Sequence, residues 1–213
     1  MATARDRWLE ILAVLCIGAA PDVFFSTAQA CGAGAAPWTP TAHAVSVLLR
    51  AVWVSVPVLW ILRRSGEPLP TFGLAAFRWA DLWLGVVTLG AAVAVDLLVW
   101  PLFAGGAGPA AAVEHGAPAP VPLLLMMSAA NGFAEELVVR AYLLTRLRPL
   151  LGALPALLLS TAVFTAYHTY LGAEGALRIA ATGLVLGGTY LVVPRLWPVA
   201  VAHALLDAVA LWP

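Results

Sequence analysis

Ionisable side chains lie inside three apolar stretches of the sequence, where they could take part in chemistry. The stretches read "NGFAEELVVRAY" (131–142), "FTAYHTY" (164–170) and "VAHALLDAV" (201–209). Their ionisable members of interest are Glu135, Glu136, Arg140, His168, His203 and Asp207. An ionisable group at bilayer depth costs about 2.5–3.5 kcal/mol on insertion scales, so such groups indicate a functional site by default.

The first stretch combines a predicted ion pair with a second acid. Glu136 and Arg140 are four residues apart on one helical face, with the acid first, which is the favourable order for an intrahelical pair. Glu135 is rotated by about 100° from Glu136, so Arg140 cannot serve both acids equally. Glu135 is therefore predicted to be the spare carboxylate. The alternative is a structural ion pair beside one acid that faces water.

The other two stretches supply histidines that could help to activate water. His168 follows Phe164 by one helical turn, and His203 and Asp207 share a helix face. One possibility is a general base formed by Glu135 and a histidine. Another is a zinc ion held by Glu135, His168 and His203 with an open position. The structural alternative for each polar group is a hydrogen bond between packed helices.

The composition indicates the elements that would hold these groups. Of 213 residues, 62% are hydrophobic and 10% are charged, whereas soluble domains average about 45–50% apolar and about 25% charged residues. We therefore predict an all-α, polytopic membrane bundle, with residues 1–213 as one domain and a motif-bearing core at 121–212. Stretches of about 20 apolar residues can span a bilayer, and about seven are predicted, at 8–30, 42–62, 81–104, 121–146, 152–170, 176–193 and 196–212.

Arginine placement predicts the orientation. Arginines precede the first span or lie in the second, fourth and sixth links, namely Arg5, Arg7, Arg63, Arg64, Arg78, Arg146, Arg148 and Arg195. Because positive charge favours the cytoplasmic side, the N-terminus is expected in the cytoplasm. The first span resembles a signal peptide, but Glu10, Pro21 and Asp22 interrupt its apolar core, which favours an uncleaved helix. No basic run suggests a nucleic-acid partner.

Three further charges lie about 20 Å deep in their predicted spans. They are Asp22, Arg50 and Asp96. Equal depth permits an ion pair of Arg50 with either acid, or Arg50 could extend to the outer surface. Counted at 1.5 Å per residue from the cytoplasmic ends of their predicted spans, His203 lies only about 10 Å deep, whereas Glu135 lies about 17–20 Å deep. The two can meet only if the segment "VVPRLWP" dips into the protein, with Arg195 reaching down to the inner surface.

The ordered motifs resemble a known family. "EELVVR" is similar to EExxxR, "FTAYH" to FxxxH, and "HALLD" to an HxxxN-or-D ending. This set resembles the CPBP intramembrane proteases, which include the CAAX prenyl endopeptidases and the bacteriocin-processing and self-immunity (Abi) proteins. The resemblance covers residues 131–207, whereas the first 120 residues match only as hydrophobic spans.

The resemblance implies roles for these residues. Glu135 would activate water with help from His168, while Glu136, Arg140 and Phe164 would support the site structurally. His203 and Asp207 would stabilise the oxyanion, or His203 would ligate a metal with Glu135 and His168. Zinc and metal-free glutamate mechanisms are both compatible with the family. Asp207 departs from the common Asn, and an ionised Asp only accepts hydrogen bonds, so it must be protonated, orient His203 or touch a metal.

The expected function is hydrolysis of a peptide bond in a membrane-associated peptide or protein by an intramembrane endopeptidase. The partners are then membrane lipid and a substrate with a hydrophobic segment. The Arg-only, Ala-rich composition is typical of a GC-rich bacterium and places the protein in the cell inner membrane. The alternatives are a proton- or ion-coupled transporter, in which the same groups relay protons, and a catalytically inactive immunity-type homologue.

Overall fold

The computed structural model describes residues 4–33, 39–103 and 119–211, and the regular elements in these ranges are all helices. The helices are α1 (Ala4–Gly18), α2 (Ala20–Ala30), α3 (Pro40–Arg64), α4 (Trp79–Phe103), α5 (Val121–Glu136), α6 (Thr145–Leu151), α7 (Ala153–Ala166), α8 (Gly172–Val192) and α9 (Leu196–Ala210). Short helical segments are η1 (Leu69–Phe72), η2 (Leu137–Leu144) and η3 (Thr169–Leu171). The predicted all-α membrane fold is confirmed.

The number of spanning helices differs from the expected seven. Among the residues that the structure describes, four segments are long and apolar enough to cross a membrane: Pro40–Arg64, Trp79–Pro101, Val121–Leu151 and Thr169–Val192. The α1–α2 pair, bent by 51°, would make a fifth. Helices α7 and α9 have only 14 and 15 residues, which is short of the about 20 that a span needs. The count of seven is therefore not confirmed.

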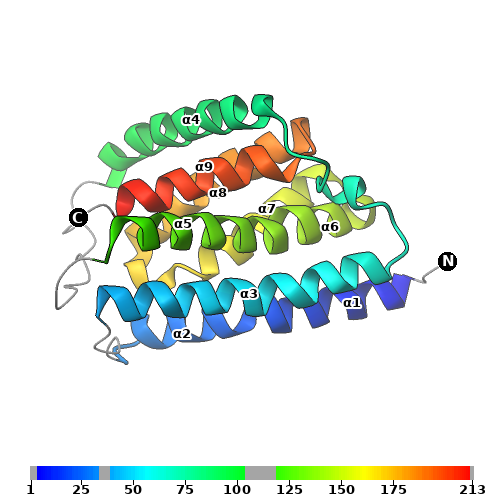
Figure 1. The fold of residues 1–213 in the computed structure, drawn as a ribbon, viewed down its shortest axis with the longest axis horizontal. Coiled ribbons are helices and arrows are strands. Elements are labelled where there is room, and N and C mark those ends of the chain that lie inside the picture. Colours follow the sequence, from blue (N-terminus) through cyan, green and yellow to red (C-terminus); the bar gives the residue numbers. More distant parts are fainter. Residues whose placement is uncertain (1–3, 34–38, 104–118, 212–213) are drawn as a thin grey trace.

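The helices run back and forth along one axis of the molecule (Figure 1). Helix α5 lies centrally and packs on α3 and α9, while α4 covers α8 and α9. The starts of α1, α4, α7 and α9 lie at one end of the bundle, and the starts of α3, α5 and α8 lie at the other. The alternation inferred from the arginines thus agrees with the order of the helices in space.

The central helical run changes its winding just after the two glutamates. Residues Leu137–Leu144 form a π-helix between α5 and α6, and all eight are buried. Ser160 from α7 donates a hydrogen bond to the Val139 carbonyl in this segment (2.9 Å). π-Helical turns are rare overall, but those that occur are often at functional sites. The altered winding therefore indicates that this part of the core could belong to a functional site.

The connection between α8 and α9 is the break that the two prolines predict. Residues 193–195 are not helical, and the Leu196 amide donates to the Gly73 carbonyl (3.0 Å). Gly73 has φ +72°, and a Cβ there would lie 2.8 Å from the Leu196 nitrogen. Arg195, in this connection, binds the Asp81 carboxylate through Nε and Nη2 (2.6 Å each). This hydrogen-bonded pairing raises the pKa of Arg195.

Candidate active site

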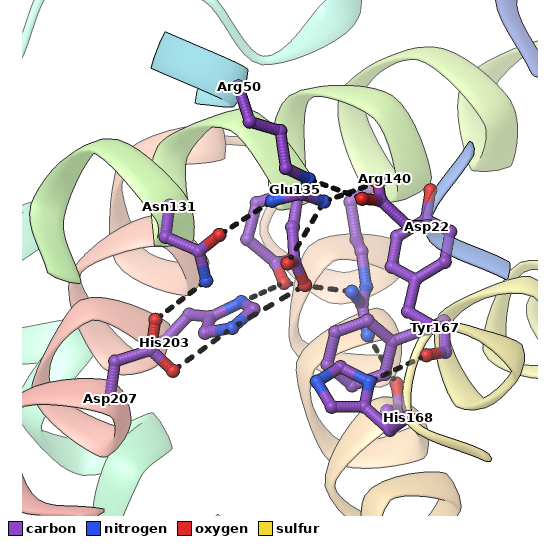
Figure 2. A network of polar contacts seen from close by, with 12 residues as sticks. Asp22, Arg50, Asn131, Glu135, Arg140, Tyr167, His168, His203 and Asp207 are labelled. Atoms are coloured by element: carbon purple, nitrogen blue, oxygen red, sulfur yellow. Dashed lines mark hydrogen bonds and ion pairs between the residues drawn. The ribbon is translucent and has the colours of Figure 1, made fainter. Parts of the chain in front are cut away.

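Close packing of α5 against α9 brings the two halves of the polar site together. At Gly132 an added Cβ would lie 2.8 Å from the Ala204 nitrogen and 3.2 Å from the Ala200 carbonyl oxygen. Small residues at such crossings let two backbones approach closely. As a result, Glu135 and Glu136 at the end of α5 face His203 on α9. Figure 2 shows Glu135 beside His203.

Glu136 joins three elements through one oxygen. Its Oε1 accepts from Arg140 Nη1 (2.8 Å) and from His203 Nδ1 (2.8 Å). The Glu136 and Arg140 side chains are fully buried. Arg140 also donates to the Gly183 carbonyl (3.2 Å) and lies over the Phe164 ring. The predicted Glu136–Arg140 pair is therefore present, and it extends to α9, α8 and α7.

Glu135 is not the isolated carboxylate that helix geometry predicted. Its Oε1 lies 3.3 Å from Arg50 Nη2, an arginine on α3. Its Oε2 is buried, lies 3.8 Å from His203 Nε2, and has no hydrogen-bond partner among the described residues. One oxygen is thus held while the other is free to accept a proton.

Arg50 forms an ion pair with Asp22, which is one of the two acids predicted to lie at the same depth. Its Nε and Nη2 donate to the two Asp22 oxygens (2.6 Å each), and its Nη1 donates to Asn131 Oδ1 (2.8 Å). Asp96 instead pairs with Arg178. Sequence reasoning missed Asn131, although it lies four residues before Glu135 and thus on the same helix face.

Asp207 is oriented by Asn131. Arginine has only donors, so the Asn131 oxygen faces Arg50 and its amide NH₂ faces Asp207. Asn131 Nδ2 accordingly donates to Asp207 Oδ2 (2.8 Å), and Asp207 Oδ1 lies 3.6 Å from His203 Nε2. Figure 2 shows Asn131 between Arg50 and Asp207. Asp207 is therefore next to His203, with one oxygen used as an acceptor.

His168 stands at the edge of this group. Its Nδ1–H donates to the Phe164 carbonyl (3.0 Å), which leaves Nε2 as an acceptor in the neutral ring. The Phe164 ring lies 5.1 Å from the His168 ring and 5.5 Å from the His203 ring, centroid to centroid. Within the described ranges, no hydrogen bond or ion pair joins His168 to Glu135 or His203. Phe164 is thus in contact with both histidines.

The fit of a metal ion can be judged from the donor set. Across residues 4–33, 39–103 and 119–211, no group of three or more His, Cys, Asp or Glu side chains is arranged to hold a metal. The Nδ1 atoms of His168 and His203 are engaged by Phe164 and Glu136. The side chains as placed do not form the zinc site of Glu135, His168 and His203.

The arrangement is that of a buried acid–base site inside a helical membrane protein. Residues 117–209 match the family model described as type II CAAX prenyl endopeptidase Rce1-like. The match spans less than half of the chain and confirms the family resemblance that the motifs indicated. At the family level it supports a CAAX-type intramembrane protease. No curated protein and no solved structure matches the chain.

Proposed function

We propose that the protein hydrolyses a peptide bond of a membrane-associated peptide or protein, with Glu135 as the general base. The observation that carries this proposal is the free Oε2 of Glu135, which is buried and directed toward His203. An unpartnered buried carboxylate oxygen is costly, and a general base needs such an acceptor within reach of water. The family match supports the same class of reaction.

In the proposed chemistry, Glu135 acts first as a base and then as an acid, and His203 stabilises the oxyanion. Glu135 takes a proton from water, and the resulting hydroxide adds to the scissile carbonyl carbon. His203, with Nδ1–H bound to Glu136, presents Nε2 toward the developing oxyanion and stabilises it as a protonated ring. The C–N bond then breaks, and the proton held by Glu135 passes to the leaving amine. The products are a carboxylic acid and an amine, and Glu135 is again deprotonated for the next cycle.

Two further residues complete the proposed site. Asp207 orients His203 and contacts its Nε2 side, while His168 helps to place the water or the substrate from the α7 side. Glu136, Arg140 and Phe164 hold the helices in register. The substrate carries a hydrophobic or membrane-anchored segment, and the protein acts in the cell inner membrane with its N-terminus in the cytoplasm.

Glu135→Gln tests the assignment of the base. The amide keeps the shape but cannot take the proton, and general base catalysis contributes about 10²–10⁴-fold, so cleavage should fall by at least about 100-fold. The measurement is cleavage of a quenched peptide library by purified protein in detergent. Glu174→Gln, at an acid in the first turn of α8, is the matched control and should cleave like the wild type.

The outcomes separate the proposal from its rivals. A folded Glu135→Gln variant within a few-fold of the wild type would refute the role of Glu135. Ion flux in proteoliposomes without cleavage would favour a transporter. A wild-type protein with neither activity would fit an immunity-type homologue. Metal analysis of the active protein, with and without a chelator, distinguishes a metal-dependent mechanism from a glutamate-only one.

A further inference from the structure

We propose that Arg50 is a positioning residue for Glu135, and that Asp22 and Asn131 hold Arg50 in place for this purpose. This inference rests on the proposed function and deepens it. Asp22 and Arg50 lie on α2 and α3, outside residues 117–209 that match the family model. The N-terminal part of the chain would therefore complete the site that the C-terminal part carries.

The guanidinium of Arg50 is fixed by groups other than Glu135. The two hydrogen bonds from Nε and Nη2 to the Asp22 carboxylate set the plane of the guanidinium. The hydrogen bond from Nη1 to Asn131 sets the rotation of the guanidinium. Such two-pronged arginine–carboxylate pairs are geometrically specific. Nη2 still reaches Glu135 Oε1 at 3.3 Å. Arg50 thus meets Glu135 as an already oriented donor.

This contact has two consequences for Glu135. Because Oε1 is held by Arg50, Oε2 is the oxygen that faces His203. A positive charge close to a carboxylate also favours its ionised form, which a general base requires before it can take a proton. The Glu135 side chain is only 7% exposed, compared with 24% for Arg50, so water provides little of this stabilisation.

Asp22 is itself placed by the bend between α1 and α2. It lies in the first turn of α2, directly after the 51° bend. At the bend, Tyr167 donates to the Gly18 carbonyl (3.3 Å), and a Cβ on Gly18 would lie 2.9 Å from a Val138 methyl group. The bend is therefore packed against the central helical run, which keeps Asp22 within reach of Arg50.

A simpler role for Arg50 would be to tie α2 to α3 through Asp22. That role predicts a loss of stability on substitution and no effect on Glu135 in a protein that still folds. The two roles differ in the ionisation of the Glu135 carboxylate, which infrared spectroscopy can follow without any substrate. Subtracting the spectrum of Glu135→Gln from that of the wild type identifies the carboxylate band of Glu135.

The test compares Arg50→Gln, Arg50→Lys and a matched control in detergent. The control is Arg178→Gln, which removes another part-buried arginine from its pair with Asp96. At a pH where the wild type shows the ionised band, Arg50→Gln should show the band of the protonated acid. Arg50→Lys, which retains the charge, and Arg178→Gln should keep the ionised band. An unchanged band in folded Arg50→Gln would overturn the inference.

Kinetics provide an independent readout on the quenched peptides. Small displacements of a catalytic group can cost about 100-fold, so kcat of Arg50→Gln should fall by about 10–100-fold with KM within a few-fold. Arg50→Lys should recover part of the loss. A change in KM alone would contradict a role in positioning the base.

Two safeguards keep the result decisive. If Arg50→Gln does not fold, Asn131→Leu is measured in its place, because it removes one of the two contacts that orient Arg50. The infrared band of Glu135 should then shift in this variant. An unchanged band would overturn the inference. A wild type that cleaves nothing would refute the proposed function, and the infrared result would still decide the role of Arg50. Normal cleavage with an unchanged band would refute the inference alone.

Discussion

Glu136 shows how one buried acid can stabilise several helices. Its Oε1 accepts from Arg140 on the same helical run and from His203 on α9, so the carboxylate neutralises one cation and orients a ring. Removing one member of a buried ion pair costs about 3–5 kcal/mol because the remaining charge stays buried. Glu136 is therefore expected to matter first for stability.

Glu136→Gln should lower the thermal unfolding midpoint in detergent by several degrees, because Arg140 keeps its charge without a charged partner. Glu67→Gln is the matched control. Glu67 pairs with Arg146, but its side chain is 41% exposed, and exposed pairs contribute about 0–1 kcal/mol. Equal midpoints for Glu136→Gln and the wild type would contradict a stabilising role for the buried pair.

Asp207 can be replaced by asparagine without disturbing the hydrogen bond from Asn131. In the Asp207→Asn variant the new amide could still accept that bond through its oxygen, and its NH₂ group would then point toward His203 Nε2. This is where the proposed oxyanion forms, and an amide donor is suited to stabilise it. The geometry around Asn131 thus accommodates the residue type that is common in the family at this position.

Asp207→Asn should therefore keep activity within about tenfold. Asp207→Leu, which removes the group that orients the proposed oxyanion donor His203, should lose about 10²–10³-fold, as when an oxyanion donor is lost. Both are measured as kcat on the quenched peptides, after checking that each variant is folded. If Asp207→Asn is as inactive as Asp207→Leu, a negative charge is needed at this position to orient His203.

The sequence predicted the contacts within single helices better than those between them. The Glu136–Arg140 pair and the shared face of His203 and Asp207 follow from the 3.6-residue period of a helix. The bond from Arg50 to Glu135 does not, because it joins residues 85 apart in the chain and depends on how α3 packs on α5.

At the scale of elements, the crossing of α5 and α9 determines whether the site exists. Gly132 brings the α5 backbone against the α9 backbone at Ala204, and Glu135 and Glu136 follow within one turn. A methyl group at 2.8 Å from a backbone nitrogen cannot be relieved by rotating a side chain. The two helices would have to move apart, and the His203 ring would move away from both acids.

Gly132→Ala should accordingly reduce kcat by at least about tenfold, since small misplacements of catalytic groups are costly, and lower the unfolding midpoint. Gly90→Ala on α4 is the matched control, because its added Cβ meets nothing within 4 Å. It should leave both quantities near their wild-type values. Similar behaviour of the two variants would show that the α5–α9 distance is not critical.

Two features at this scale could not be predicted from periodicity. The π-helix at Leu137–Leu144 has the same apolar composition as an α-helix, and its winding is set by packing inside the core. The early end of α7 at Ala166 also escaped prediction, because "YHTYL" continues the apolar pattern of the span. The short helix η3 that follows ends at Gly172, whose φ is +72°, a conformation that glycine adopts readily.

At the scale of the whole molecule, the arginines that predicted the orientation lie at one end of the bundle. Helix α6 and the links after α3 and α8 share that end with the start of α1 (Figure 1). They carry Arg148, Arg78 and Arg195, respectively. The sequence predicted this alternation because charge bias is a property of the links and does not depend on helix packing.

The side on which this arginine-rich end lies can be tested with single cysteines. Cys31 is exposed after α2, at the opposite end of the bundle from Pro70, which is exposed between α3 and α4. With Cys16 replaced by Ala, Cys31 should react with an impermeant thiol reagent in intact cells, because its end carries few positive charges and is expected outside. A cysteine introduced by Pro70→Cys, in a background lacking Cys16 and Cys31, should react only after the cells are broken. The reverse pattern would place the N-terminus outside and overturn the cytoplasmic assignment of the arginine-rich links.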